Sequence, residues 1–230
     1  MNNSAAFFDV DGTIAKGDIV RHYVYLRTSR MNFLERTFWK ALFLLKVPRY
    51  IILDKLSRHD FSCVFYRNYV NLKPPELKDR TSSYFQKSGR KSIYPAALER
   101  VQQHQRNGDM VVLVTNSLRE IVEPLARHLR VSELIAPQLE KQENQFTGAL
   151  LGGPLTDHRK AQAVAQFARE HSLDLNQCYA YADSLDDVPM LESVGNPRAI
   201  NPDRNLRRIA QRKGWKIFDW PLAENCPPSP

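Results

Sequence analysis

Two aspartates stand two residues apart near the start of the chain. Residues 7–13 read FFDVDGT, so Asp9 and Asp11 fall between an apolar run and a Gly-Thr pair. Carboxylates this close repel each other, and burying them is costly unless a positive charge pairs with them. The stretch is therefore either an ordinary strand end with a polar turn or part of a site that holds a counter-ion.

Further polar residues follow later apolar runs. Each lies where a strand is expected to end or a helix to begin, and the set is Thr115, Asn116, Ser117, Lys160, Asp183, Asp186 and Asp187. Ligands of an open α/β sheet bind outside the carboxyl ends of its strands. We therefore expect these side chains to gather with Asp9 and Asp11 at one edge of the sheet.

Such a set is suited to phosphoryl transfer. Proteins hold Mg²⁺ with one or two carboxylates together with phosphate and water oxygens. Lys160 adds a positive charge, and the Thr115 hydroxyl and nearby backbone N–H groups can bind phosphate oxygens. One carboxylate can attack phosphorus and form an aspartyl-phosphate, while its neighbour protonates the leaving oxygen and later activates water.

Each motif taken alone has a simpler explanation. DVDGT could be a loop or another kind of cation site, VTNS could be only a helix cap, and Lys160 could be a surface lysine. Acidic residues are also common at helix starts. All four in this order, each at a strand end or helix start, favour a catalytic site.

The elements that must position these residues follow a repeating strand–helix pattern. Short apolar runs predict strands at residues 5–8, 111–114 and 179–182, with a further candidate at 216–220. The alternation with helical segments is typical of a parallel sheet covered on both faces. The predicted fold class is therefore α/β, with a Rossmann-like parallel sheet as its core.

Helices are predicted after these strands. Ser117 and Glu120 form a capping-box pattern ahead of an apolar periodicity that runs to Leu129. A second helix is predicted from about Asp157 to His171, and a third from near Asp187 with Pro189 in its first turn. Residues 146–153 indicate a short hairpin or an extended loop.

The basic charge of the chain is concentrated in one segment. The 230 residues carry a net charge of +8, yet residues 20–93 alone hold 16 Lys and Arg against 5 Asp and Glu, and the remainder is net acidic. That segment favours helix throughout, with a break at Val47-Pro48. We therefore predict a discontinuous catalytic core, residues 1–17 and 95–230, and an all-helical cap at 18–94.

The cap raises the question of membrane contact. Residues 33–52 are rich in apolar side chains, but five charged residues interrupt them, so the stretch does not fit a transmembrane span. A helix lying on a membrane surface is one interpretation. The preferred interpretation is that the apolar face packs within the insert and that the basic residues are solvated.

The location is predicted from the cysteines and the N-terminus. Cys63, Cys178 and Cys226 show no metal-ligand spacing, so we interpret them as reduced thiols of a cytoplasmic protein. No secretory signal pattern precedes the first predicted strand.

The four motifs together resemble those of the haloacid dehalogenase (HAD) superfamily. They are DVDGT, VVLVTNS, Lys160 and ADSLDDVPML, and the resemblance covers nearly the whole chain outside the insert. The insert lies where the phosphoserine-phosphatase-like branch, subfamily IB, has its helical type-one cap. The resemblance implies a Mg²⁺-dependent phosphatase with a Rossmann-like core.

The resemblance also implies residue roles. Asp9 is implied to be the nucleophile and Asp11 the general acid and base, while Lys160 stabilises the charge on Asp9 and the phosphate. Asp9, the backbone carbonyl of Asp11 and the carboxylate of Asp183 are implied to bind Mg²⁺. Thr115 is implied to hydrogen-bond the transferring phosphoryl group.

Other positions are implied to surround these groups. Gly12, Thr13, Asn116 and Ser117 are expected near the phosphate, and Asp187 is expected to orient Lys160 or a metal-bound water. Asp186 stands where the family often has Asn, and Ala182 and Ser184 replace glycines. Asp18 falls where phosphoserine phosphatases carry a Glu that binds the substrate amine. Its alternative role is the N-cap of the first cap helix.

The leaving group narrows the substrate class. Family members that cleave carbon–halogen bonds lack an acid at the Asp11 position, because a halide leaves without a proton, so Asp11 favours phosphate esters. Three alternatives stay open: a small phosphomonoester, a lipid phosphate as in C-type phosphatidylglycerophosphatases, and a nucleic-acid-binding protein using the basic cap. The last is disfavoured, because no nucleic-acid-binding motif is present.

Overall fold

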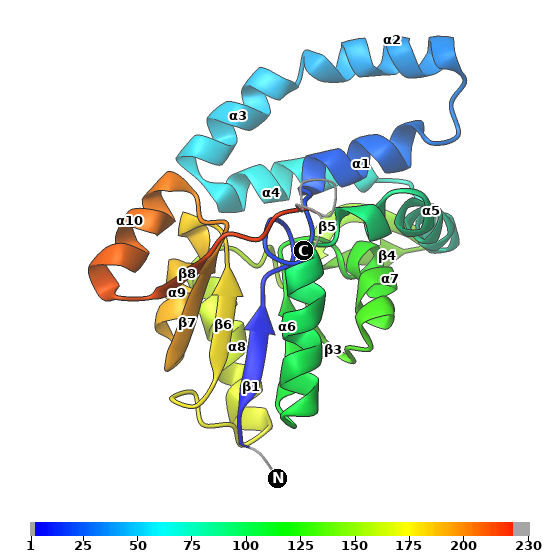
Figure 1. The fold of residues 1–230 in the computed structure, drawn as a ribbon. Helices are drawn as coiled ribbons and strands as arrows, with labels where there is room; N and C mark the ends of the chain where they lie inside the picture. Colours follow the sequence, from blue (N-terminus) through cyan, green and yellow to red (C-terminus); the bar gives the residue numbers. More distant parts are fainter. Residues whose placement is uncertain (1–2, 223–230) are drawn as a thin grey trace, which may run out of the picture.

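The computed structural model describes residues 3–222, which form a six-stranded parallel sheet and ten α-helices. The strand order is β3-β2-β1-β6-β7-β8 (Figure 1). The bounds are β1 Ala5–Phe8, β2 Met110–Val114, β3 Glu133–Ile135, β6 Tyr179–Ala182, β7 Asn196–Ile200 and β8 Lys216–Phe218. The α/β Rossmann-like fold predicted from the sequence is confirmed.

The first strand lies at the centre of the sheet. Phe7 pairs with Val112 of β2 on one side and with Ala180 of β6 on the other. Ala6 and Phe8 pack on one face of the sheet, and Ala5 and Phe7 pack on the opposite face. Both faces of β1 are therefore buried, as its continuous apolar run requires.

Five helices cover the two faces of the sheet. Their bounds are α6 Pro95–Arg106, α7 Arg119–Leu129, α8 His158–Glu170, α9 Val188–Glu192 and α10 Arg204–Lys213. Side chains of α6 and α7 pack with the core on one face, and those of α8, α9 and α10 pack on the other. The helices predicted at about 157–171 and near Asp187 are confirmed as α8 and α9.

The segment between β1 and β2 is helical, as predicted. It contains α1 Ile19–Thr28, α2 Phe33–Leu44, α3 Val47–Leu56, α4 Arg58–Tyr66 and α5 Pro74–Lys87, with short 3₁₀ turns at Arg67–Tyr69 and Gly89–Ser92. The break falls at Leu45-Lys46, so Pro48 lies in the first turn of α3, where a missing N–H is tolerated. This cap lies over the carboxyl edge of the sheet (Figure 1).

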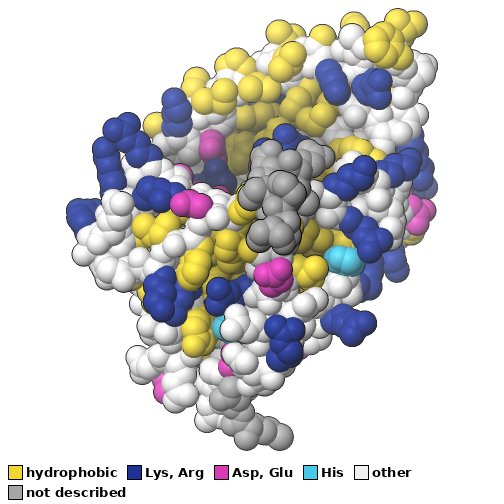
Figure 2. Space-filling model, viewed as in Figure 1, with side chains coloured by type: hydrophobic (Ala, Val, Ile, Leu, Met, Phe, Trp, Pro, Cys, Tyr) yellow, Lys and Arg dark blue, Asp and Glu magenta, His cyan; other side chains and the backbone are white. Residues whose placement is uncertain are grey.

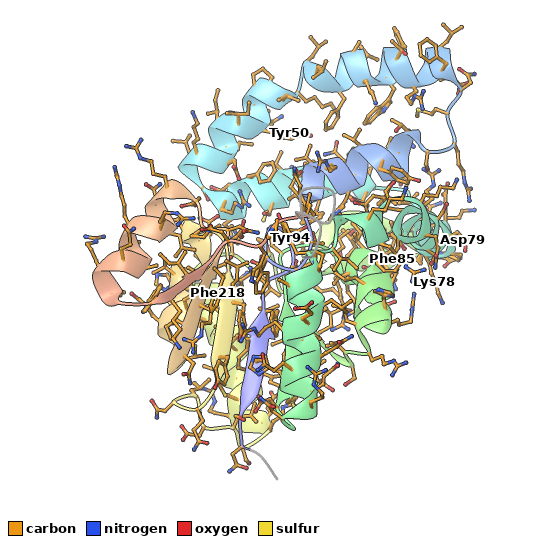
Figure 3. The ribbon with its side chains drawn as sticks, in the orientation of Figure 1. Tyr50, Lys78, Asp79, Phe85, Tyr94 and Phe218 are labelled. Atoms are coloured by element: carbon orange, nitrogen blue, oxygen red, sulfur yellow. The ribbon has the colours of Figure 1, made fainter. Side chains whose placement is uncertain are left out.

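The cap has an aromatic core of its own. Tyr50 of α3 packs against Phe43 of α2 and against Phe61 and Phe65 of α4 (Figure 3). The antiparallel hairpin of β4 Gln138–Gln142 and β5 Gln145–Leu151 supplies Phe146 to the same cluster. Residues 146–153 were predicted to be a short hairpin or an extended loop, but most of them lie in the single strand β5, whose partner β4 precedes it in the chain. This hairpin ties the cap to the core. The exact domain boundaries at 17/18 and 94/95 stay a prediction.

The outer helices of the cap confirm one expectation only in part. Phe43 and Tyr50 are the only buried residues of α2 and α3 among those that the structure describes. Their remaining large apolar side chains face outward, with Leu34, Leu45 and Leu56 each more than three-quarters exposed. The preferred interpretation, that the apolar face of this stretch packs within the insert, holds for one side only: Trp39, Phe43 and Tyr50 pack in the cap core, and the second apolar side was not expected. A long apolar run does not reveal which side of its helix is covered.

A further finding concerns the lengths of these helices. Within residues 3–222, no helix is long and apolar enough to cross a membrane.

Candidate active site

The loop after β1 turns back sharply and holds two aspartates at the sheet edge. The Asp9 N–H donates to the carbonyl of Tyr181, which continues the β1–β6 pairing by one residue. The N–H groups of Ile14 and Ala15 both donate to the Val10 carbonyl, closing the turn. The Asp9 side chain is buried as a result, while Asp11 reaches the cavity described below.

Gly12 makes this turn possible. Its φ is +95°, a backbone conformation that residues other than glycine rarely adopt. A Cβ at this position would lie 2.0 Å from Oδ2 of Asp183. The backbone of the first motif therefore lies directly against the carboxylate of the fourth motif.

Lys160 joins the first and fourth motifs. It lies in the first turn of α8, and its Nζ donates to Oδ1 of Asp9 and to Oδ1 of Asp187, both at 2.6 Å. Burial alone would lower the pKa of Lys160, but Asp187 and Asp9 outweigh burial and raise it. The lysine is therefore held as a cation. Ser184 Oγ donates to the second oxygen of Asp187 and fixes that carboxylate.

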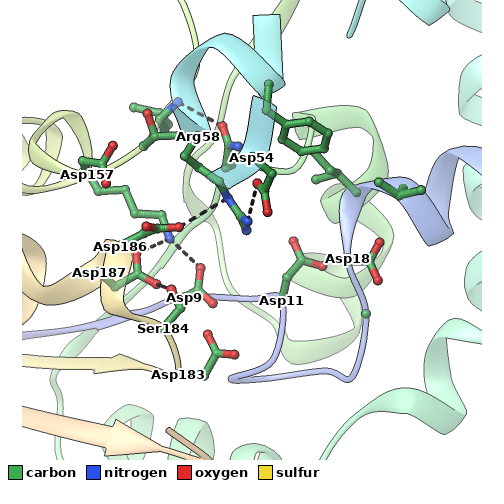
Figure 4. Close-up of a pocket in the computed structure, with 18 residues that line it drawn as sticks. Asp9, Asp11, Asp18, Asp54, Arg58, Asp157, Asp183, Ser184, Asp186 and Asp187 are labelled. Carbon is green, nitrogen blue, oxygen red and sulfur yellow. Dashed lines mark hydrogen bonds and ion pairs between the residues drawn. The ribbon is translucent and has the colours of Figure 1, made fainter. Parts of the chain in front are cut away.

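Three carboxylates converge beside this lysine. One oxygen from each of Asp9, Asp183 and Asp187 lies within 4.8 Å of the others. Burial, the largest cause, together with the neighbouring carboxylates raises the pKa of Asp9 to about 7 and that of Asp183 to about 8. In Figure 4, Asp9 lies next to Asp187, and Asp183 lies below Asp9. The repulsion between these neighbouring carboxylates therefore makes the site costly in folding free energy.

The donor set fits a hard divalent cation. It consists of oxygen atoms alone, which is the preference of Mg²⁺ rather than of softer metals. Lys160 and Ser184 donate to the two oxygens of Asp187, whereas Lys160 donates to only one oxygen of Asp9, so Asp9 and Asp183 are the carboxylates better placed for a cation. A cation there would offset the repulsion that raises the two pKa values.

Asp11 is positioned by the second motif. Ser117 Oγ donates to Oδ2 of Asp11 at 2.6 Å, and Thr115 Oγ1 lies 3.4 Å from the same oxygen. Thr115 Oγ1 also accepts from the Ser117 N–H. Both hydroxyls are fully buried against Asp11, and neither residue is among those that line the cavity described below.

The expected capping box is therefore wrong. Helix α7 begins at Arg119 with Leu118 as its N-cap, and no side chain caps it. Ser117 lies one residue too early, and its hydroxyl is engaged by Asp11. The spacing S-x-x-E is satisfied in the sequence, but a partner distant in the sequence competes successfully for the serine.

The remaining predicted residues are divided between the site and its support. Asn116 lines the cavity, donates to Ser62 Oγ of the cap and accepts from the Leu155 N–H. The Thr13 hydroxyl is buried and has no hydrogen-bond partner among the described residues. Asp18 is the N-cap of α1 through its bond to the Arg21 N–H, and it also lines the cavity.

A cavity of about 350 Å³ lies between the cap and the core, above these groups. The cap contributes Arg58, which ion-pairs with Asp54 of α3 at 2.8 Å and with Asp186 of the core at 3.4 Å. Arg58 extends from α4 toward the aspartates of the core in Figure 4. Asp186 thus connects the core to the cap.

Sequence reasoning missed three residues at this site. Arg58 and Asp54 are two of many charged residues in a basic segment, and no spacing marks them. His22 of α1 lies with Nδ1 3.8 Å from Oδ1 of Asp11, and that nitrogen has no hydrogen-bond partner in the described part of the chain. No local pattern in the sequence indicates that α1 would bring a histidine to Asp11.

The fold and the site agree with the comparisons with known proteins. A family model described as haloacid dehalogenase-like hydrolase matches residues 6–192. The phosphoserine phosphatase SerB1 of Mycobacterium tuberculosis is 32% identical over 227 residues, covering 97% of this chain and 73% of that protein. A histidinol-phosphatase of Neisseria meningitidis serogroup C is 30% identical over 132 residues, covering 56% of this chain and 60% of that protein.

One solved structure is similar over almost its full length. It is a protein with unknown function from Bordetella pertussis Tohama I, with a TM-score of 0.80 and 28% identity over 95% of this chain and 99% of that one. The chain belongs to the haloacid dehalogenase-like hydrolase family. The family and the enzyme class predicted from the sequence are thereby confirmed.

Proposed function

We propose that the protein is a Mg²⁺-dependent phosphatase that hydrolyses a small phosphomonoester through an aspartyl-phosphate on Asp9. The observation that carries the proposal is the convergence of Asp9, Lys160, Asp183 and Asp187 at a cavity next to Asp11. Attack on a phosphate needs three groups of this kind: a fixed nucleophile, a cation that offsets charge repulsion, and a separate acid.

Asp9 is the proposed nucleophile. Lys160 donates to its Oδ1, so Oδ2 is the oxygen available for attack on phosphorus. The new Oδ2–phosphorus bond forms as the bond from phosphorus to the ester oxygen breaks. The ion pair with Lys160 holds the carboxylate in place and keeps a positive charge beside the phosphoryl oxygens.

Asp11 is the proposed acid and base. In the first step its carboxyl gives a proton to the departing alkoxide. In the second step its carboxylate takes a proton from water, which attacks phosphorus, releases inorganic phosphate and restores the Asp9 carboxylate. Ser117 and Thr115 orient Asp11 for both steps through Oδ2.

Mg²⁺ fits the oxygen donors of this site. Asp9, the backbone carbonyl of Asp11 and Asp183 would hold it. When bound, the ion supplies positive charge that offsets the repulsion between the aspartates and the phosphate dianion.

The cap, residues 18–94, is proposed to choose the leaving group. It contributes Asp18, Asp54 and Arg58 to the cavity, together with the apolar side chains of Ile19 and Phe61. Relatives named phosphoserine phosphatase and histidinol-phosphatase make phosphoserine and histidinol phosphate the first substrates to test. The comparisons give no support to the lipid-phosphate or nucleic-acid alternatives.

A cytoplasmic location stays a prediction. Cys63 and Cys178 are free thiols, which agrees with it, and Cys226 lies outside the described residues.

The test is phosphate release from a panel containing phosphoserine, histidinol phosphate and a phosphatidylglycerophosphate. Each is assayed with Mg²⁺, with EDTA, and with the Asp9→Asn variant. We expect turnover of a small ester that disappears in EDTA and in Asp9→Asn. Asp79→Asn, an exposed aspartate on α5 (Figure 3), is the matched control and should keep full activity. Turnover by Asp9→Asn at the wild-type rate would refute the proposal.

A further inference from the structure

The outer side of the cap carries a continuous apolar surface. Of the twelve exposed large hydrophobic residues in the described chain, nine fall between residues 33 and 56. They are Phe33, Leu34, Phe38, Leu42, Leu44, Leu45, Ile51, Ile52 and Leu56, and we call this set the apolar ridge. Scattered exposed hydrophobic residues need no explanation, but a contiguous patch marks an interaction site.

An ordinary amphipathic helix is apolar on one side only, but α2 carries apolar side chains on two opposite sides. On α2, Trp39 and Phe43 face the cap core, where they stack with ring centroids 5.0 Å apart. At 100° per residue, Leu34, Phe38 and Leu45 lie on the opposite side, away from the protein. The side turned to solvent is therefore as apolar as the side turned to the core.

The ridge also protrudes from the molecule. Helices α2 and α3 form the outermost layer, farthest from the sheet, and hydrophobic side chains line this rim in the space-filling view (Figures 1 and 2). A protruding surface fits a broad, flat partner better than it fits a narrow groove.

Charge decides which partner suits the ridge. Exposed Arg36, Lys40, Lys46, Arg49 and Lys55 accompany it, against the acidic residues Glu35 and Asp54. The whole segment 20–93 holds 16 basic and 5 acidic residues. A second copy of the chain would bring the same net positive face and be repelled. An anionic lipid surface supplies both negative headgroups and an apolar layer beneath them.

We propose that the apolar ridge docks the protein on the surface of an anionic lipid bilayer. The apolar side chains of α2 and α3 enter the headgroup region, and the flanking Lys and Arg side chains bind lipid phosphates. The contact is peripheral and independent of what the active site hydrolyses.

Docking has a consequence for the active site. Helix α3 carries Ile51, Ile52 and Leu56 on the ridge and Asp54 at the cavity. Only the thickness of that helix, about 10 Å, then separates the cavity from the lipid surface. The cavity would therefore experience the negative potential of the bilayer.

The test is co-sedimentation of the full chain with vesicles, without substrate or Mg²⁺. One set of vesicles is phosphatidylcholine alone, and the other also contains phosphatidylglycerol. We expect binding to the second set that weakens as salt rises, because ions screen the Lys and Arg contacts. Binding to neither set at low salt would overturn the proposal.

Variants locate the contact. Leu34→Ser combined with Phe38→Ser should weaken binding by about tenfold or more, since both side chains lose their apolar contact. Leu151→Ser, at an exposed apolar residue of β5 outside the ridge, should bind like the wild type. Equal losses in the two variants would contradict docking through the ridge.

The charge contribution is measured in the same way. Arg36→Gln with Lys40→Gln should weaken binding to anionic vesicles by about fivefold for each charge removed. Arg212→Gln, at an exposed arginine of α10, is the control and should have less effect. Light scattering tests whether the ridge binds a second copy of the chain instead. A dimer that Phe38→Ser dissociates would show such binding and would overturn the proposal.

Discussion

The backbone of Gly12 lies directly against the Asp183 carboxylate. A Cβ at Gly12 would lie 2.0 Å from Oδ2 of Asp183, and φ at this position is +95°. Gly12→Ala is therefore expected to displace Asp183 and to lower kcat by on the order of 100-fold. Gly108→Ala is the control, because its φ is +78° but nothing lies within 4 Å of its Cβ. Both variants should lose about 1 kcal/mol of stability from backbone strain, but only Gly12→Ala should lose activity.

Ser117 acts on the reaction through Asp11. Its hydroxyl donates to Oδ2 of Asp11 at 2.6 Å, so Ser117→Ala leaves that carboxyl less well oriented. We expect kcat for an alkyl phosphate to fall about tenfold, because proton donation to a poor leaving group is impaired. An aryl phosphate, whose leaving group needs less protonation, should be affected much less. An equal loss on both esters would show that Ser117 does not act through Asp11.

Asp183 makes stability depend on pH in the metal-free protein. Burial and the neighbouring carboxylates raise its pKa from 3.8 to about 8, so the folded state binds a proton that the unfolded state has released. Between these pH values, the metal-free protein therefore loses stability as pH rises. Asp183→Asn should remove the part of this dependence that Asp183 causes, while Asp9, whose pKa is also raised, keeps its own part. The variant should be more stable than the wild type near pH 8 by on the order of 1–3 kcal/mol.

Chemical unfolding in EDTA across this pH range measures the effect. The advantage of Asp183→Asn should be small near pH 4 and grow toward pH 8, and Mg²⁺ should stabilise the wild type more than the variant. Asp79→Asn is the control, since this aspartate is exposed on α5. An advantage that does not change with pH would contradict the assignment of this proton to Asp183.

Helix α4 contributes one charged side chain, Arg58, to the cavity. Arg58 is the only basic residue that the described part of the cap contributes to the cavity lining, and it pairs with Asp54 and Asp186. Arg58→Gln leaves these two carboxylates unpaired near the incoming phosphate. KM should rise about fivefold, equal to about 1 kcal/mol, with kcat little changed. Arg36→Gln on α2 is the control, and a loss confined to kcat would contradict this role.

Which elements could be predicted depended on local signals. Strands β1, β2 and β6 are continuous apolar runs that end at polar residues, so the strands and their ends could be predicted from the sequence. Strand β7 was not predicted, because its sequence NPRAI contains proline and arginine and is held in place by pairing with β6 and β8. Tertiary pairing overrides weak local propensity there.

The same division applies to the candidate site. Asp9, Asp11, Lys160 and Asp183 were predictable because each lies within three residues of the end of a strand or the start of a helix. The roles of Ser117 and Arg58 were not, since each depends on a partner more than 100 residues away in the sequence. Spacing along the chain contains no information about such partners.

At the scale of the whole molecule, the cap and the core differ in charge and in surface. The core gathers carboxylates at its sheet edge, and the cap places a basic segment over them, with the apolar ridge on its far side. At the cavity, the attraction between the described residues of the two parts comes from the ion pair of Arg58 with Asp186. The far side of the cap is left for a partner outside the chain.

The central claim is that Asp9 becomes phosphorylated. The direct measurement is mass spectrometry of the protein after a brief reaction with its best substrate and an acid quench. The account predicts a mass gain of one phosphoryl group, located on the peptide that contains Asp9, in the wild type and in Asp79→Asn. Steady turnover without any such adduct, or an adduct that persists in Asp9→Asn, would contradict it.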